Sequence, residues 1–124
     1  MHILIVDDEP LVRAMAKRAL RDYECDMASD SEEALELYEE HHYDLVVTDL
    51  LMPGKNGHQL TCELLDLEDA PQIIVITACA DARLRQDLLS RGVKQVFTKP
   101  MDLAALETEV ESLAQQSQVR VSQS

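Results

Sequence analysis

Short, wholly apolar runs alternate with longer stretches of helical periodicity along this chain of 124 residues. Unbroken runs rich in β-branched residues are typical of strands buried on both faces, the pattern of a parallel sheet. Five strands separated by helices imply right-handed crossovers, so we expect an α/β fold: a doubly wound, five-stranded parallel sheet in a three-layer sandwich. The apolar runs are residues 3–6, 45–47, 73–76 and 96–97, with a weaker candidate at 25–28.

Helix signals fall between these runs. Pro10 is favoured at a first helical position, Asp30 and Ser31 precede a helix with two acidic residues in its first turn, and Gly92 suits a helix end. We expect a first helix from Pro10, with Leu11, Met15 and Ala19 on one stripe beside Val12 and Ala16, and a second after Ser31 that buries Ala34, Leu35 and Tyr38. A third is expected over 57–67, with Leu60, Leu64 and Leu67 at helical spacing, and a fourth over 81–91. The fifth begins after Asp102 and repeats Leu103, Leu106, Val110 and Leu113.

The length suits one domain, expected over residues 1–117, followed by a polar tail at 118–124 that frays. The chain has 24 Asp and Glu against 11 Lys and Arg, a formal net charge of −13. Such a charge repels nucleic acid and anionic lipid, so neither DNA nor a membrane is an expected partner. Asp7 and Asp8 interrupt the first apolar run, so no signal peptide is expected, and no run approaches the 18 apolar residues of a membrane span. Cys25, Cys62 and Cys79 form no metal or disulfide pattern. We expect a cytoplasmic protein with free thiols.

Polar side chains follow four of the apolar runs at the point where each run ends. Asp7 and Asp8 follow the first, Asp49 lies just past the 45–47 run, Thr77 follows the next, and Lys99 comes after the last. The carboxyl ends of parallel strands line a common crevice where ligands bind. These side chains are therefore expected to converge.

Three ionised carboxylates in one crevice repel one another. At about 5 Å and an effective dielectric constant of about 20, each pair costs roughly 3 kcal/mol. Mg²⁺ compensates such repulsion, since it takes one or two carboxylates and leaves positions for phosphate oxygen. A nearby Lys and a hydroxyl can neutralise or hydrogen-bond phosphoryl oxygens, so the set predicts phosphoryl transfer onto an Asp. Each residue alone is commonplace in a turn or helix cap; their joint placement carries the prediction.

Over residues 2–117 the sequence resembles the receiver domain of two-component response regulators, in its single-domain, chemotaxis-regulator-like form. The resemblance implies a flavodoxin-like (βα)5 fold with strand order 2-1-3-4-5. It is carried by Val6-Asp7-Asp8-Glu9-Pro10, by Asp49-Leu50-Leu51-Met52-Pro53-Gly54-Lys55-Asn56-Gly57, by Thr77-Ala78 and by Lys99-Pro100.

The resemblance implies a role for each site residue. Asp49 is the phosphoacceptor; Asp8, Asp49 and the backbone carbonyl of Leu51 bind Mg²⁺, with Mn²⁺ as an alternative, and Asp7 acts directly or through a metal-bound water. Lys99 pairs with Asp49 and then with a phosphoryl oxygen, and it precedes a cis peptide bond to Pro100. Thr77 moves its hydroxyl onto the phosphoryl group, which is the switch.

The resemblance also implies partners. The phosphoryl group comes from a phosphohistidine of a sensor histidine kinase or a histidine phosphotransfer protein, and the output goes to a downstream protein target through the fourth helix, fifth strand and fifth helix. The chain itself is expected not to be an enzyme, beyond phosphorylating itself from donors and slowly losing the group.

Three positions depart from common receiver patterns. Val96 occupies the place, three residues before the Lys, where many receivers have Tyr or Phe, and Phe97 should face the other side of the sheet. Leu51 and Cys79, two residues beyond the Asp and the Thr, offer no group to orient an attacking water. An aromatic switch is therefore not expected, whereas a persistent phosphoryl group is.

Other readings use parts of the same pattern. A haloacid-dehalogenase-type phosphatase needs a general-acid Asp where this chain has Leu51, and a flavodoxin-like cofactor binder lacks its glycine-rich loop among three glycines. A pseudo-receiver acting only as a binding module would not need the complete polar set. His41 and His42, at a helix end, diverge by about 100° and are expected at the surface.

Overall fold

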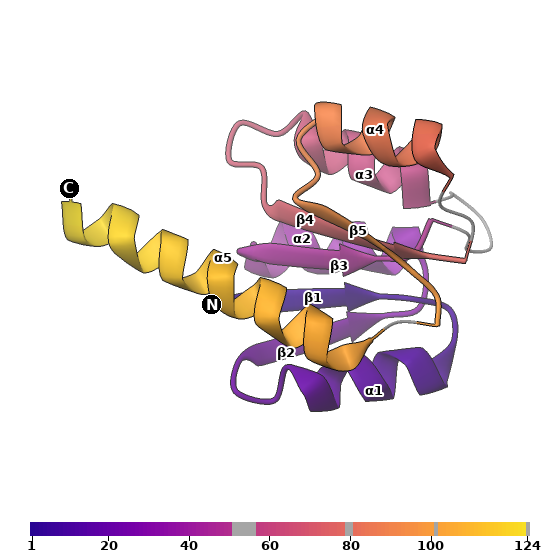
Figure 1. Cartoon of the computed structure of the whole chain (residues 1–124), viewed down its shortest axis with the longest axis horizontal. Helices are drawn as coiled ribbons and strands as arrows, with labels where there is room; N and C mark the ends of the chain where they lie inside the picture. The colour runs from indigo at the N-terminus through magenta and orange to yellow at the C-terminus, as the bar shows by residue number, and fades with distance from the viewer. Residues whose placement is uncertain (51–56, 79–80, 101, 124) are drawn as a thin grey trace.

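A computed structural model describes residues 1–50, 57–78, 81–100 and 102–123. Five parallel strands alternate with five helices, in the sheet order β2-β1-β3-β4-β5 (Figure 1). The predicted fold class and strand order are both confirmed. The elements are β1 His2–Val6, α1 Pro10–Ala19, β2 Glu24–Ala28, α2 Ser31–His41, β3 Leu45–Thr48, α3 Gly57–Leu65, β4 Gln72–Thr77, α4 Ala82–Ser90, β5 Gln95–Thr98 and α5 Leu103–Gln123.

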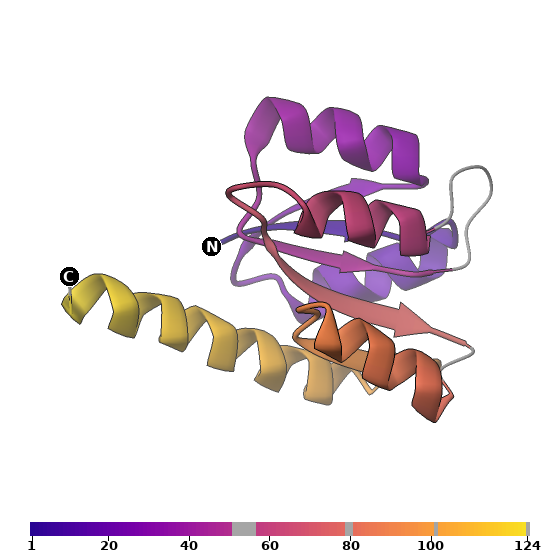
Figure 2. The same cartoon turned by 90° about the horizontal axis from the view of Figure 1, so that it is seen from above.

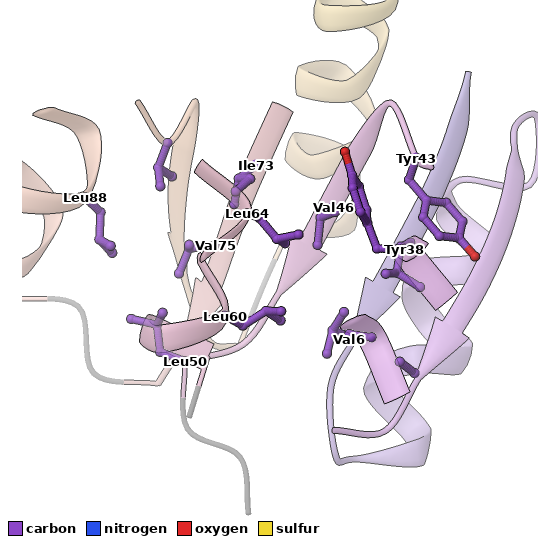
Figure 3. Close-up of a cluster of buried hydrophobic side chains, with 14 of the residues drawn as sticks. Val6, Tyr38, Tyr43, Val46, Leu50, Leu60, Leu64, Ile73, Val75 and Leu88 are labelled. Carbon is purple, nitrogen blue, oxygen red and sulfur yellow. The ribbon is translucent and has the colours of Figure 1, made fainter. Parts of the chain in front are cut away.

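Helices cover both faces of the sheet. α1 and α5 lie on one face, and α2, α3 and α4 lie on the other (Figures 1 and 2). Alternate strand residues supply the two cores: Leu4 and Val46 pack towards α2 and α3, whereas Ile3 and Ile5 pack towards α5. Figure 3 shows the first of these cores, to which Tyr38, Leu60, Leu64 and Leu88 contribute from the helices.

The helix starts follow the sequence signals. Pro10 opens α1, the Asp30 carboxylate accepts from Glu33 N at 2.8 Å to cap α2, and Asp81 caps α4 in the same way through Leu84 N. Gly92 ends α4 with φ +113°, a backbone conformation that favours glycine. These local signals fix the starts of α1, α2 and α4 and the turn after α4, and so the points at which the chain leaves or enters the neighbouring strands.

Two expectations about helices are wrong. The stripe of Leu11 and Met15 does not face the core: these side chains are 70% and 41% exposed, and the core receives Ala16 and Leu20 instead. α5 extends to Gln123, and the expectation that residues 118–124 fray stays a prediction. Leu67, expected in the third helix, lies beyond its end and is 41% exposed.

Candidate functional site

The residues singled out at the strand ends converge at one edge of the sheet. Asp7 follows β1, Asp49 follows β3, Thr77 ends β4 and Lys99 follows β5, four strands that are neighbours in the sheet. The Lys99 Nζ atom lies 2.9 Å from Asp49 Oδ2 and 3.1 Å from Asp7 Oδ2. These two carboxylates are almost fully buried, so the cation neutralises charge in a site that water barely reaches.

Glu9 is a third partner of Lys99, at 2.8 Å, that sequence reasoning did not single out. Its place directly after the Asp pair was the available signal. Burial lowers the pKa of Lys99, but the hydrogen bonds to Glu9, Asp49 and Asp7 outweigh it and hold the pKa above its usual range. One ammonium therefore serves three carboxylates, matching its three N–H donors.

The Asp7 carboxyl is fixed by its own turn. Its Oδ1 accepts from Glu9 N at 2.9 Å, and its backbone carbonyl accepts from Arg13 at 2.6 Å. Burial raises the pKa of Asp7, and the Glu9 backbone bond and Lys99 lower it without cancelling the rise. Asp8, the next residue, is exposed. The pair thus directs one carboxylate towards Lys99 and leaves the other open to solvent.

Asp49 is held by backbone contacts on both sides. Its N–H donates to Val6 O at 3.0 Å, and its carbonyl accepts from the Thr48 hydroxyl at 2.9 Å. Gly57, the first residue of α3, packs so closely that an added Cβ would lie 1.9 Å from Asp49 O. The glycine is thus required by the close approach of α3. Leu51, the turn residues Pro53 and Gly54, Asn56 and Cys79 lie outside the described residues.

The ends of β4 and β5 are tied together beside the site. Lys99 N donates to Thr77 O at 2.9 Å, and Thr77 is buried. The Lys99–Pro100 peptide bond is cis, as the resemblance implied. Val96 packs into the core beneath α4, while Phe97 packs on the opposite side of the sheet, as predicted from strand alternation.

The donor set suits a hard divalent cation. Asp7, Asp8, Glu9 and Asp49 each offer a carboxylate oxygen, and these atoms lie within 4.8 Å of one another. Oxygen ligands of this kind are those that Mg²⁺ takes, usually one or two carboxylates with several waters. The residues fit the metal that the sequence predicted, and Glu9 is an additional candidate near it.

The sequence model of the response regulator receiver domain matches residues 3–111. The chain belongs to the receiver domain family. A receiver is a phosphoacceptor module of two-component signalling, and that is the function of this chain. The receiver domain family has a signalling role and is not a classical enzyme family.

Two similar proteins match most of this chain over a part of their own length. The chain is 38% identical over 117 residues to the sensor protein EvgS of Escherichia coli K12, covering 93% of this chain and 10% of EvgS. It is 34% identical over 112 residues to the transcriptional regulatory protein MalR of Bacillus subtilis, covering 87% of this chain and 48% of MalR. The receiver thus spans between a tenth and about half of these relatives.

A solved structure matches in fold and in sequence. Response regulator TrrA of Thermotoga maritima, determined in complex with Mg²⁺ and BeF, is 35% identical, with a TM-score of 0.78 over 90% of this chain and 97% of that one. A CheY-like receiver of Methanospirillum hungatei, 23% identical, matches in fold with a TM-score of 0.87 over 96% and 97% of the two chains.

Outside the site, the described part of the chain contains no helix long and apolar enough to cross a membrane. His41 and His42 are exposed, as expected. Cys25 and Cys62 are free thiols, and burial raises the pKa of Cys25.

Proposed function

We propose that Asp49 accepts a phosphoryl group from a phosphohistidine of a histidine kinase or a histidine phosphotransfer protein. The observation that carries the proposal is the buried Asp49 carboxylate, 2.9 Å from the Lys99 ammonium, at the edge where four strands end. An Asp49 oxygen attacks phosphorus and forms the new O–P bond, while the N–P bond breaks and its electron pair returns to the imidazole.

The neighbouring groups stabilise the transferred charge. Lys99 shifts from pairing with the Asp49 carboxylate to a phosphoryl oxygen, and the Thr77 hydroxyl donates a hydrogen bond to another. Asp7, Asp8, Asp49 and the Leu51 carbonyl would hold Mg²⁺, with Mn²⁺ as an alternative, and the cation would neutralise charge on the phosphoryl oxygens. With Leu51 in place of a general-acid Asp, the chain holds the phosphoryl group and does not turn it over as a phosphatase would.

Intact mass measurement tests the acceptor. With acetyl phosphate and Mg²⁺ we expect one phosphoryl group per chain, and none with Asp49→Asn, because the amide is not a nucleophile for phosphorus. Asp66→Asn, which changes an exposed carboxyl elsewhere, is the control and should be phosphorylated like the parent. Undiminished phosphorylation of Asp49→Asn would contradict the assignment, and steady release of phosphate from small phosphomonoesters would favour the phosphatase.

The exposed face of α1 is the proposed docking surface for the phosphodonor protein. Leu11 is 70% exposed and Met15 41%, large apolar groups on a surface that is otherwise strongly charged. α1 contains Arg13, Lys17 and Arg18 and no acidic residue, although the chain as a whole carries −13. An exposed apolar pair on a helix that carries basic and no acidic residues suits an acidic, partly apolar partner.

This surface adjoins a pocket that reaches Lys99, the residue that pairs with Asp49. A pocket of about 360 Å³ lies between α1 and α5 and is lined by Val12, Met15 and Leu103 together with Lys99 and Glu9. A side chain from a protein seated on α1 can enter the pocket beside Lys99. The donor histidine is thereby brought near Asp49.

Leu11→Glu is expected to slow transfer from a phosphorylated histidine phosphotransfer protein about tenfold or more, because the buried apolar contact is lost. Phosphorylation by acetyl phosphate should not change, since this small donor needs no docking surface. Leu67→Glu, at an apolar site that is 41% exposed and lies away from α1, is the control in a quench-flow assay. Equal loss with both donors would point to damage to the site, and undiminished protein transfer would place docking elsewhere.

The output is proposed to pass through the surface of α4, β5 and α5 to a downstream protein target. Thr77 lies at the end of β4, just before the segment that leads to α4, and Lys99 follows β5 directly. A change in the contacts of these two residues is therefore transmitted first to α4 and β5. The acidic character of the rest of the chain disfavours DNA as the direct target.

A further inference from the structure

β5 is an edge strand, and two side chains cap its free edge. Among the described residues it pairs with β4 alone, so the backbone groups of Val96 that point outwards have no strand partner there. Val96 N–H donates to the side chain of Gln95 at 3.0 Å, and Val96 O accepts from Arg85 Nη1 at 2.5 Å. The second guanidinium nitrogen, Nη2, lies 3.4 Å from Thr98 Oγ1. Arg85 thus reaches from α4 to two residues of β5.

The two elements that Arg85 joins are both connected along the chain to residues of the acceptor site. α4 follows Thr77 in the chain, and Thr98, the last residue of β5, directly precedes Lys99. Thr77 and Thr98 are also register partners in the sheet. A displacement of either strand end therefore changes the distance between Arg85 and its partners in β5.

Arg85 makes its contact where an aromatic gate is missing. The Val96 side chain is 1% exposed and packs with Val75 and Leu88 beneath α4, so it has little freedom to move between two positions. The guanidinium on the backbone of the same residue is half-buried and makes hydrogen bonds to Val96 O and Thr98 Oγ1, which can break and re-form at small cost. Of the two, the guanidinium contact is the better candidate for a two-state element.

We propose that Arg85 is a latch between α4 and β5 that stabilises the conformation in which Lys99 pairs with Asp7, Glu9 and Asp49, and that opens when Asp49 carries a phosphoryl group. The latch rests on the proposed function of Asp49. An Arg suits it because one planar group can donate to both Val96 O and Thr98 Oγ1, whereas a Lys presents a single point of charge. Arg85 acts through α4 and β5 and is a positioning residue.

Removing the latch should favour occupancy of the site. Arg85→Ala destabilises the latched conformation only, so by reciprocal coupling it should bind Mg²⁺ with beryllofluoride, a mimic of the phosphoryl group, about threefold to tenfold more tightly than the parent. Arg85→Lys should fall between the two. Arg83→Ala, which removes an exposed Arg of the same helix, is the matched control and should bind like the parent.

Hydrogen exchange gives a readout that needs no ligand. In the free protein, Arg85→Ala should speed amide exchange in α4 and β5 and leave β1 and β3 unchanged, because only the contact between α4 and β5 is lost. Thermal unfolding of each variant checks that it is folded.

The outcomes separate the latch from the acceptor. If the parent binds no beryllofluoride with Mg²⁺, the function proposed for Asp49 fails, and exchange in α4 still tests whether Arg85 holds that helix. If the parent binds but Arg85→Ala binds equally or more weakly, the latch is overturned, since the contact then persists in the occupied state or belongs to it. Tighter binding together with faster exchange in α4 supports it.

Discussion

Gly57→Ala is expected to destabilise the receiver by roughly 3 kcal/mol or more, a large part of the stability of a domain this size. The added Cβ would lie 1.9 Å from Asp49 O and 2.7 Å from the Cα of Leu50. Both neighbours are backbone, so no change of rotamer relieves the overlap, and the start of α3 must move away from the end of β3. The hydrogen bond that Gly57 N donates to Leu50 O at 3.0 Å would be strained as well.

Thermal unfolding in the presence of a chelator measures the effect, for which we expect a fall in Tm of about 10 °C or more. Gly92→Ala is the matched control, because its Cβ meets only the end of Leu65 at 3.5 Å. Its cost comes from φ +113° and should be about 1–3 kcal/mol. A Tm of Gly57→Ala at or above that of Gly92→Ala would contradict the steric argument.

The same displacement reaches the acceptor. Asp49 O is the atom that the new methyl group would strike, so the carboxylate of the same residue moves relative to Lys99. The fraction of Gly57→Ala that remains folded should therefore be phosphorylated more slowly by acetyl phosphate. A positioning error of about 1 Å is enough to cost a factor on the order of 100 in such reactions.

The sheet was predictable because its central strands are buried on both faces. After His2 and Gln72 at the starts of β1 and β4, the strands β1, β3 and β4 consist of buried β-branched and aliphatic residues, the pattern of a strand covered on both faces. β2 has a weaker sequence pattern because it lies at the edge of the sheet, where Asp26 is half-buried and Met27 is 36% exposed. The strand ends then placed Asp7, Asp49, Thr77 and Lys99 together without any knowledge of distances.

The rotation of α1 and the role of Glu9 were not predictable in the same way. Leu11 and Met15 repeat at four residues, and so do Ala16 and Leu20, so periodicity permits either pair to face the sheet. The choice depends on how much room the sheet and α5 leave, which is a tertiary property. The contact of Glu9 with Lys99 joins residues 90 positions apart and depends on where β5 ends relative to β1.

Lys99→Met is expected to lower the free energy of unfolding at pH 7 by about 3 kcal/mol in the absence of divalent metal. The substitution keeps the length of the side chain and removes the cation that pairs with the buried Asp7 and Asp49 carboxylates. Glu9 is 59% exposed and retains its hydration, so its pairing adds little to this cost. The variant is left with two buried carboxylates that repel each other.

The pH dependence follows from two raised pKa values. The pKa of Lys99 is raised on folding, so its contribution is complete below about pH 10.5 and is lost only as the pH rises through the native value. The pKa of Asp7 is raised above 3.8 by burial, so ionisation of Asp7 opposes folding as the pH rises past that value. Without Lys99 the pKa of Asp7 rises further, and the penalty at pH 7 grows.

Lys99→Met should therefore regain stability relative to the parent as the pH is lowered from 7 towards 5, because Asp7 then takes up a proton. Saturating Mg²⁺ should restore stability at pH 7, by about 2.7 kcal/mol at 100 times its dissociation constant, since it replaces the missing positive charge. Urea unfolding at both pH values, with chelator and with Mg²⁺, measures these effects. Lys94→Met, which removes an exposed cation, is the control and should behave like the parent in all four conditions. A loss in Lys99→Met that is equal at pH 5 and pH 7 and insensitive to Mg²⁺ would mean that Lys99 stabilises the fold through packing and not through its charge.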